Sequence, residues 1–221
     1  MPFWIRRAAL ASVAGIIAGI WLNWRIGLTV AALVAIADTI YHSKSTSVIP
    51  AAVRVTAAQR RTQRRLVVLR PAGFMALNAR SIPGSDSVID HLVIGPTGVY
   101  AVDSEYWDRR LPIRASSGNV LYHGPTSKKE RLVHARWEAA QAARLVGGVL
   151  AQELSVQPVM VIYGPKIPWA VANLRGVDVL GGGLVRKYFR RQARANRQPR
   201  LTAAQISRIY EAAAGVLPPM G

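Results

Sequence analysis

The sequence predicts an α/β domain, with a central mixed sheet flanked by helices, preceded by a two-helix transmembrane hairpin. Three observations lead to this expectation. Two apolar runs open the chain, strand-like and helical runs then alternate, and 221 residues leave room for one soluble domain plus an appendage. Cysteine is absent, which excludes a disulfide scaffold, thiolate catalysis and Cys-based metal sites.

The first two expected helices form the membrane hairpin, which occupies residues 1–41. Residues 8–24 are uncharged and apolar, at the short end of what ~30 Å of hydrocarbon requires, and a second run follows at residues 26–41. Basic residues flank the outer ends and only Arg25 lies between the runs, which predicts cytoplasmic ends. We therefore expect a multi-pass protein of the cell membrane with its soluble domain in the cytoplasm. A signal peptide and a pair of buried core helices are the competing interpretations.

A short linker and a further helix are expected next. Residues 42–55 are small and polar enough for a linker, and the soluble domain is expected over residues 56–217. Residues 56–69 predict a helix that carries four arginines and ends before Pro71 and Gly73, because neither residue continues a helix well.

Strand-like runs follow this helix. Most are short, rich in Val, Ile and Leu, and bounded by Gly, Pro or Ser. Gly-Pro-Thr-Gly between two of these runs is a hairpin signal. The expected strands cover residues 74–78, 88–94, 98–103, 111–113, 119–122, 158–163 and 177–180.

Helices interrupt and close this series of strands. Apolar residues spaced by threes and fours predict a long helix over residues 128–154, and two more are expected at residues 184–195 and 202–216. Thr202 with Gln205 three positions later predicts a capping box at the start of the last helix. The order of helix, strands, helix, strands and helices is typical of an α/β domain with a mixed sheet.

The charge of the chain predicts an anionic partner. Lysine and arginine number 29 against 11 acids, a formal net charge of +18. Nucleic acid and the anionic face of a membrane are the two partners that such an excess favours. We expect no small-molecule cofactor.

An acidic segment lies inside this basic sequence. Residues 86–108 contain no lysine or arginine but hold five of the eleven acids. In the predicted hairpin, Asp90 lies on the first strand, and Asp103 and Glu105 lie at the end of the second. Converging carboxylates can hold Mg²⁺, which prefers oxygen ligands. For each acid alone, a turn cap or a solvated side chain is the alternative. His91 should point away from the Asp90 carboxylate, so we expect it to pack or to form hydrogen bonds.

The predicted helix at residues 184–195 is strongly basic. Spacings of three and four place a set of cations along one side, which suits contact with a phosphate backbone. Attraction of this side to anionic lipid headgroups is the alternative. The expected nucleic-acid-binding residues are Lys187, Arg190, Arg191 and Arg194.

The predicted hairpin resembles a known family. Residues 89–104, Ile-Asp-His-Leu-Val-Ile-Gly-Pro-Thr-Gly-Val-Tyr-Ala-Val-Asp-Ser, are similar to the signature hairpin of the nuclease-related domain, NERD, a branch of the PD-(D/E)xK nuclease-like superfamily. The similarity covers about residues 56–217 and is greatest to actinobacterial, membrane-anchored members. It implies a restriction-endonuclease-like fold, with Asp90 and Asp103 as metal ligands and a lysine two positions after the second acid that activates water.

Two positions depart from the family pattern. The triplet reads Asp103-Ser104-Glu105, so a glutamate stands where the family has its lysine. The family's glutamate in the first helix is replaced by Gln59 or Arg60, depending on the alignment. The resemblance therefore implies an altered site in which Asp90, Asp103 and Glu105 form the catalytic and metal-binding set, with Mg²⁺ as the expected ion.

Three functions stay open at this point. The leading expectation is a membrane-anchored NERD-domain protein that binds nucleic acid, with a degenerate metal-dependent nuclease site. The second is an active Mg²⁺-dependent nuclease whose lysine has moved to Lys128 or Lys129, with Gln141 as a candidate for positioning water. The third is a non-enzymatic, membrane-associated scaffold whose basic surface contacts lipid headgroups.

Overall fold

The computed structural model describes residues 51–195 and 201–220. The expected membrane hairpin at residues 1–41 and the linker up to residue 50 lie outside the described residues. Within the part that is described, no helix is both long enough and apolar enough to span a bilayer.

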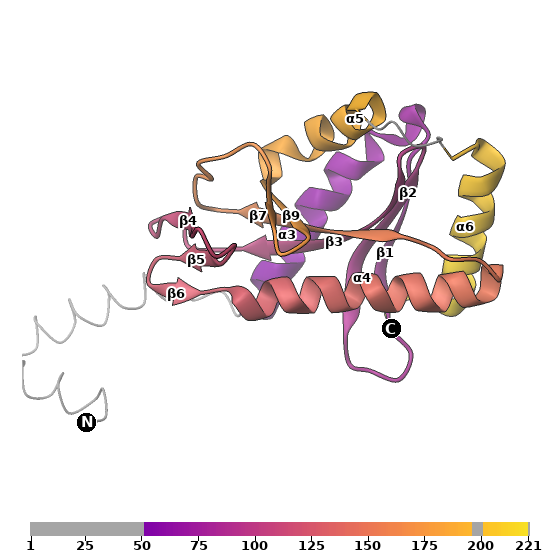
Figure 1. The fold of residues 1–221 in the computed structure, drawn as a ribbon, viewed down its shortest axis with the longest axis horizontal. Coiled ribbons are helices and arrows are strands. Elements are labelled where there is room, and N and C mark those ends of the chain that lie inside the picture. Colours follow the sequence, from indigo (N-terminus) through magenta and orange to yellow (C-terminus); the bar gives the residue numbers. More distant parts are fainter. Residues whose placement is uncertain (1–50, 196–200, 221) are drawn as a thin grey trace, which may run out of the picture. The chain divides into compact units, whose positions relative to one another are not determined.

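A six-stranded mixed sheet forms the centre of the domain (Figure 1). Its strand order is β1-β2-β3-β7-β9-β8. Strands β3, β7 and β9 run parallel, while β1, β2 and β8 each run antiparallel to a neighbour. The strands are β1 (Met75–Ser81), β2 (Val88–Gly95), β3 (Gly98–Tyr106), β7 (Val156–Tyr163), β8 (Ala172–Leu174) and β9 (Val177–Gly181).

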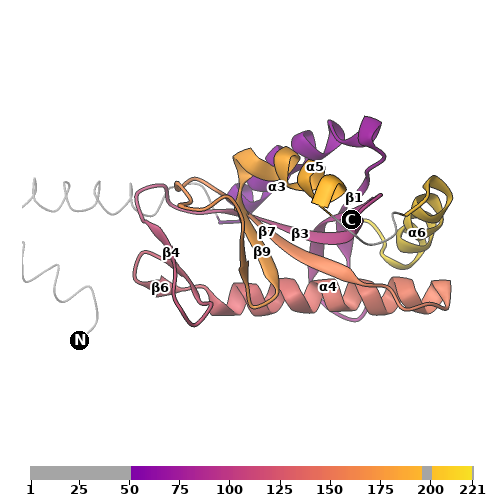
Figure 2. The same cartoon turned by 45° about the horizontal axis from the view of Figure 1, so that its top comes forward.

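Helices cover both faces of this sheet. Helices α3 (Ala51–Val67) and α5 (Val185–Ala195) pack on one face, and α4 (Lys129–Leu150) and α6 (Ala203–Val216) pack on the other. Figure 2 shows this layering, with α3 and α5 on the opposite side of the sheet from α4. The predicted mixed α/β architecture is thus confirmed.

Smaller elements join these layers. Two 3₁₀ turns follow α3 and β9, and a three-stranded sheet lies between β3 and α4 in the chain. These elements are η1 (Arg70–Ala72), η2 (Gly182–Leu184), β4 (Ile113–Ala115), β5 (Leu121–His123) and β6 (Thr126–Ser127).

Alternation along β3 divides its side chains between the two faces. Val99 and Ala101 pack in the core beneath α4 and α6, while Tyr100 and Val102 pack beneath α3 and α5. Successive strand residues point to opposite faces, so Asp103 continues the row that faces α4. The helix reaches this row closely because its buried side is lined by alanines, Ala135, Ala139 and Ala142.

Strand β2 leaves the regular ladder at Asp90. The residues on either side of it, Ile89 and His91, both pair with β1, but Ala79, which lies between their partners, has a φ of 47°. Pairing of β2 with β3 likewise runs only as far as His91 and Val102. Because of this local break, the direction of the Asp90 side chain is not set by the regular alternation of the strand.

Residues near the C-terminus cover part of the outer edge of β1. The Ser81 N–H donates to the Pro218 carbonyl, and the Met220 N–H donates to the Ala79 carbonyl. The Arg80 guanidinium also donates to the Leu217 carbonyl. Part of an edge that would otherwise be open to other chains is therefore paired internally.

Most predicted elements are confirmed, including the β2–β3 hairpin and the capping box of Thr202 and Gln205. Helix α3 differs, because it begins at Ala51, inside the expected linker. Helix α4 ends at Leu150 rather than at residue 154, since Ala151 adopts a left-handed conformation with φ of 51°.

Two strands also differ from expectation. The strand expected at residues 111–113 lies at Ile113–Ala115, because Pro112 has no N–H to give to a ladder. Strand β8 was not expected. It forms a tight hairpin with β9 through Arg175 and Gly176, both at positive φ, and arginine is not a usual residue in such a turn.

Candidate functional site

The C-terminal half of β3 carries two buried acids. Asp103 and Glu105 alternate with Ser104 along the strand, so both carboxylates point toward α4. Asp103 is 7% exposed and Glu105 is 9% exposed. Burial of charged groups is costly unless a partner compensates them, so each carboxylate needs a nearby donor.

Arg131, in the first turn of α4, supplies that partner. Its Nη2 atom lies 3.2 Å from Asp103 Oδ2 and is also ion-paired with Glu105 Oε1. One guanidinium nitrogen therefore contacts carboxylates of two residues. The sequence analysis missed Arg131, although a long cation beside the buried stripe of α4 is the signal that could have identified it.

Asp90 is held from the other side of the sheet. Gln59 Nε2, on α3, donates to Asp90 Oδ1 at 2.5 Å, and the Ser104 N–H donates to Asp90 Oδ2 at 2.8 Å. The structure therefore selects Gln59 over Arg60 as the α3 residue at the site. An amide at this position donates a hydrogen bond to the acid, which a glutamate would not do.

A fourth acid, Glu138, comes from α4. It lies two turns after Arg131, is 6% exposed, and contacts His134 Nε2 at 3.0 Å through Oε1. The sequence analysis did not identify it, although a charged residue between the buried Ala135 and Ala139 was a readable signal. Together we call Asp90, Asp103, Glu105 and Glu138 the acid cluster.

Burial and mutual repulsion raise pKa values in the acid cluster. Burial raises the pKa of Asp90 to about 6, although hydrogen bonds from Ser104 and Gln59 oppose the shift. Burial, followed by the charges of Glu105 and Asp90, raises the pKa of Asp103 to about 8. Arg131 pulls the pKa of Asp103 down, but burial and the other carboxylates outweigh it.

Of Asp90, Asp103 and Glu138, Glu138 has the most strongly shifted pKa. Burial and then the charges of Asp103 and Asp90 raise its pKa to about 9. Burial also lowers the pKa of the neighbouring His134. The raised pKa of Glu138 and the lowered pKa of His134 both weaken the attraction between opposite charges at their 3.0 Å contact.

Within residues 51–195 and 201–220, no group of three or more His, Asp and Glu side chains is placed to hold a metal ion. The three acids expected to bind Mg²⁺ instead share their oxygens with protein donors. Metal binding by Asp90, Asp103 and Glu105 stays a prediction.

The two lysines considered as replacements lie elsewhere. Lys128 Nζ lies 5.5 Å from the centre of the Trp107 indole ring, and Lys129 is exposed. The basic side chain in contact with Asp103 is Arg131. The geometry therefore gives no support to a lysine relocated to either position.

Two other candidates have structural roles. Gln141 accepts hydrogen bonds from Arg144 on the outer side of α4. His91 Nδ1 is hydrogen-bonded to Asn78 Oδ1 at 2.7 Å, as expected for a packing residue. Burial lowers the pKa of His91 to about 4, so its ring is neutral near pH 7.

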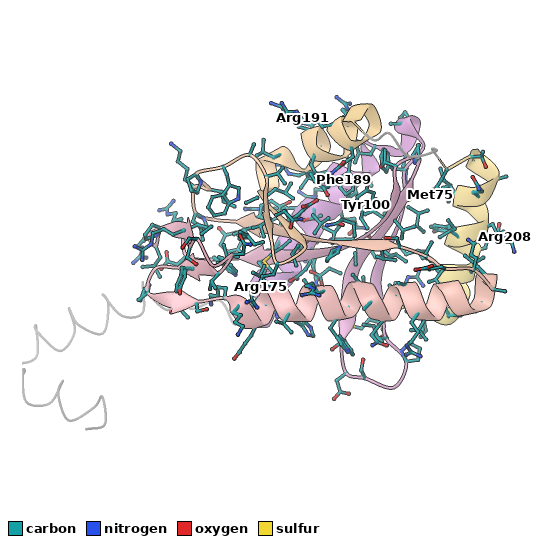
Figure 3. All side chains as sticks on the ribbon, viewed as in Figure 1. Met75, Tyr100, Arg175, Phe189, Arg191 and Arg208 are labelled. Atoms are coloured by element: carbon teal, nitrogen blue, oxygen red, sulfur yellow. The ribbon has the colours of Figure 1, made fainter. Side chains whose placement is uncertain are left out.

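Exposed cations cover the outer sides of α3 and α5. We call this set the basic surface. Figure 3 shows Arg191 projecting from α5, while Phe189 lies inward near Tyr100. The Arg194 side chain lies outside the described residues. The basic surface comprises Arg60, Arg61 and Arg64 of α3 and Arg186, Lys187, Arg190 and Arg191 of α5.

Helices α3 and α5 share one hydrophobic core, so their cations lie on the same face of the sheet. Gly183 of η2 and the four cations of α5 line a surface hollow. Anions are expected to gather at such a concentration of positive charge.

The comparison with protein families finds a match over the segment that carries this hairpin and these acids. Residues 54–163 match the family model described as NERD, nuclease-related domain. This match supports the NERD family for the chain. Comparisons with curated proteins and with solved structures gave no significant match.

Proposed function

We propose that this protein is a membrane-anchored NERD-domain protein that binds nucleic acid through the basic surface and has a degenerate hydrolytic site. The observation that carries the proposal is the clustering of exposed cations from two helices, α3 and α5, on one face of a nuclease-related domain. Nucleic-acid binding by such a surface is largely electrostatic, because each phosphate contact releases a counterion.

The degenerate site rests on two replaced positions. Glu105 stands where the family resemblance implies a lysine, and it is ion-paired with Arg131. Gln59 stands where the resemblance implies a glutamate, and it donates to Asp90. With these partners the acids are held in a closed hydrogen-bonded arrangement, and no lysine that could activate water contacts Asp103 among the described residues.

Membrane anchoring rests on the sequence. Residues 8–41 form two apolar runs with basic flanks, and the described domain begins ten residues later. The anchored domain would then face the cytoplasm, where nucleic acid and anionic lipid are both present.

The salt dependence of DNA binding tests the proposed function. We would measure binding of a fluorescent DNA duplex and a single strand to the full chain in a non-ionic detergent. In a triple variant, Lys187→Ala, Arg190→Ala and Arg191→Ala, affinity should fall and the slope of log K against log salt should decrease by roughly 2 to 3.

A matched triple variant controls for net charge. Arg136, Arg144 and Arg175 are exposed cations away from the basic surface, and their replacement by Ala should leave the slope nearly unchanged. Equal loss in both variants would mean that binding is not localised, which contradicts the proposal. If neither variant loses affinity for DNA, the scaffold that contacts lipid headgroups becomes the better account.

A further inference from the structure

We propose that Arg131 is the built-in counter-cation of the acid cluster, standing in the place that a divalent metal ion would need. This role of Arg131 rests on the degenerate site of the proposed function. Its tests contain no nucleic acid, so its failure can be distinguished from a failure of nucleic-acid binding by the basic surface.

The first support is the position of the guanidinium. Arg131 Nη2 lies 3.2 Å from Asp103 Oδ2 and 3.5 Å from Asp103 Oδ1, and it is ion-paired with Glu105 Oε1. These oxygens are the ones that a cation bound between the two acids would use. A divalent ion and a guanidinium cannot occupy that point together, because both carry positive charge and both need the same oxygens.

The second support is the inventory of carboxylate oxygens. Both oxygens of Asp90 accept hydrogen bonds, from Gln59 and from the Ser104 N–H. The second oxygen of Glu105, Oε2, accepts from Trp107 Nε1 at 3.1 Å. Five of the six oxygens of the three expected metal ligands therefore accept a hydrogen bond from a protein donor, and the sixth, Glu105 Oε1, is ion-paired with Arg131.

The third support is how Arg131 is anchored. Its side chain is 42% exposed, and its Nη2 atom reaches the buried carboxylates of Asp103 and Glu105. Leu132 and Ala135, on the same helix, are buried in one core with residues of β7 and β9, and this packing fixes the start of α4 on the sheet. The guanidinium is thus placed by the packing of α4 and does not depend on a flexible loop.

The inference predicts a latent metal site that appears when Arg131 is removed. Arg131→Met keeps an apolar stem but removes the charge, which leaves Asp103 and Glu105 without their cation. A bound divalent ion would restore the lost compensation and would stabilise the folded state by mass action.

Thermal unfolding of the full chain with Mg²⁺, Mn²⁺ or Ca²⁺ gives the first measurement. Wild type should show the same Tm with and without each ion. Arg131→Met should have a lower Tm than wild type, and Mn²⁺ or Ca²⁺ should recover several degrees of it. Arg131→Lys, which keeps a cation, and Arg136→Met, which removes an exposed arginine of the same helix, should not respond to metal.

Terbium luminescence gives a second measurement that locates the ion. The Trp107 indole contacts Glu105, so Tb³⁺ bound at the acid cluster would be sensitised by this ring. Arg131→Met should show saturable, tryptophan-sensitised luminescence that wild type lacks. The signal should disappear when Asp103→Asn or Trp107→Phe is added to that variant.

Either of two outcomes overturns the inference. One is saturable metal stabilisation or sensitised luminescence in wild type, which would show that metal enters while Arg131 is in place. The other is a folded Arg131→Met variant that responds to no ion. If Arg131→Met does not fold, the wild-type titrations together with Arg131→Lys decide, because a metal response in either contradicts the role of Arg131.

Discussion

Trp107 Nε1 donates a hydrogen bond to Glu105 Oε2, the carboxylate two positions before it in the chain. Arg131 is ion-paired with the other oxygen of Glu105, so both carboxylate oxygens of this side chain have a protein partner. Trp107 is 7% exposed and lies against His123, with ring centres 5.1 Å apart. Glu105 is therefore a fixed partner of Arg131, which affects any attempt to restore a lysine there.

The first prediction concerns restoration of the family triplet. Glu105→Lys alone would place an ammonium beside the Arg131 guanidinium, and like charges at this distance repel. We expect this variant to be less stable and to cleave no DNA. Glu105→Lys combined with Arg131→Ala leaves one cation beside Asp103, and we expect Mn²⁺- or Mg²⁺-dependent cleavage about 10²-fold above wild type, measured on labelled DNA.

Asp103→Ala added to this double variant is the control and should abolish the cleavage. A wild-type chain that cleaves DNA robustly, and loses activity in Asp103→Ala and also in Lys128→Ala or Lys129→Ala, would contradict the degenerate site. It would instead establish the enzyme with a relocated lysine.

The second prediction concerns the pH dependence of stability. Burial raises the pKa of Glu138 from 4.5 to about 9, so between these values the folded chain holds a proton that the unfolded chain has released. The free energy of unfolding therefore falls as pH rises through this window. Asp103, raised from 3.8 to about 8, contributes in the same direction. The groups that face Glu138 are Asp90, Asp103, Glu105, Arg131 and His134.

Glu138→Gln removes this ionisation while keeping the shape of the side chain. We expect its Tm to match that of wild type near about pH 5 and to exceed it near about pH 9. The reason is that only in wild type does unfolding release a proton from this side chain, which favours the unfolded state as pH rises. Glu153→Gln, an exposed acid after α4, is the control. Parallel Tm profiles for wild type and Glu138→Gln would show that Glu138 is not the responsible group.

The third prediction concerns Gly164, which follows β7 and lies against the Trp107 backbone. Its φ is 107°, and a Cβ at this position would overlap the backbone carbonyl oxygen of Trp107. Gly164→Ala should lower the free energy of unfolding by about 3 kcal/mol, from backbone strain and overlap together. The tryptophan fluorescence of the folded state should change as well, because Trp107 must move.

Gly84→Ala separates the two contributions. Gly84 has a similar positive φ of 80°, but no atom lies within 4 Å of the added Cβ. Its replacement should cost only about 1 kcal/mol. Equal losses for the two variants in chemical denaturation would mean that the overlap at Trp107 is relieved at no cost.

The fourth prediction concerns topology. If residues 8–41 insert as a hairpin with cytoplasmic ends, a fluorescent protein fused after Gly221 should fold and fluoresce in the cytoplasm. A phosphatase reporter at the same position, active only outside the cytoplasm, should stay inactive. An active phosphatase fusion would overturn this topology.

Much of the fold follows from local patterns in the sequence. The β2–β3 hairpin could be predicted because apolar runs flank a Gly-Pro-Thr-Gly turn, and the start of α6 could be predicted from Thr202 and Gln205. Strand β8 could not be predicted, since three residues are too few to show alternation and the turn that follows it contains Arg175 at positive φ. Its position depends on pairing with β9, which is a tertiary effect.

The acid cluster could be predicted only in part. Asp90, Asp103 and Glu105 were found because they lie close together in sequence, on one hairpin. Arg131 and Glu138 were missed because their interactions join α4 to strand residues 26 or more positions earlier. Helix periodicity shows which side of α4 is buried, but it does not show which strand residues meet that side.

The pairing of residues 217–220 with β1 has a consequence for synthesis of the chain. Arg80 and Leu217 are 137 positions apart, so the edge of β1 stays uncovered until the ribosome has passed Met220. At roughly 5–20 residues per second this interval is on the order of 10 s. During that time the nascent domain exposes the unpaired edge of β1. Where several ribosomes translate the same message close together, this edge could pair with the β1 edge of a neighbouring nascent chain.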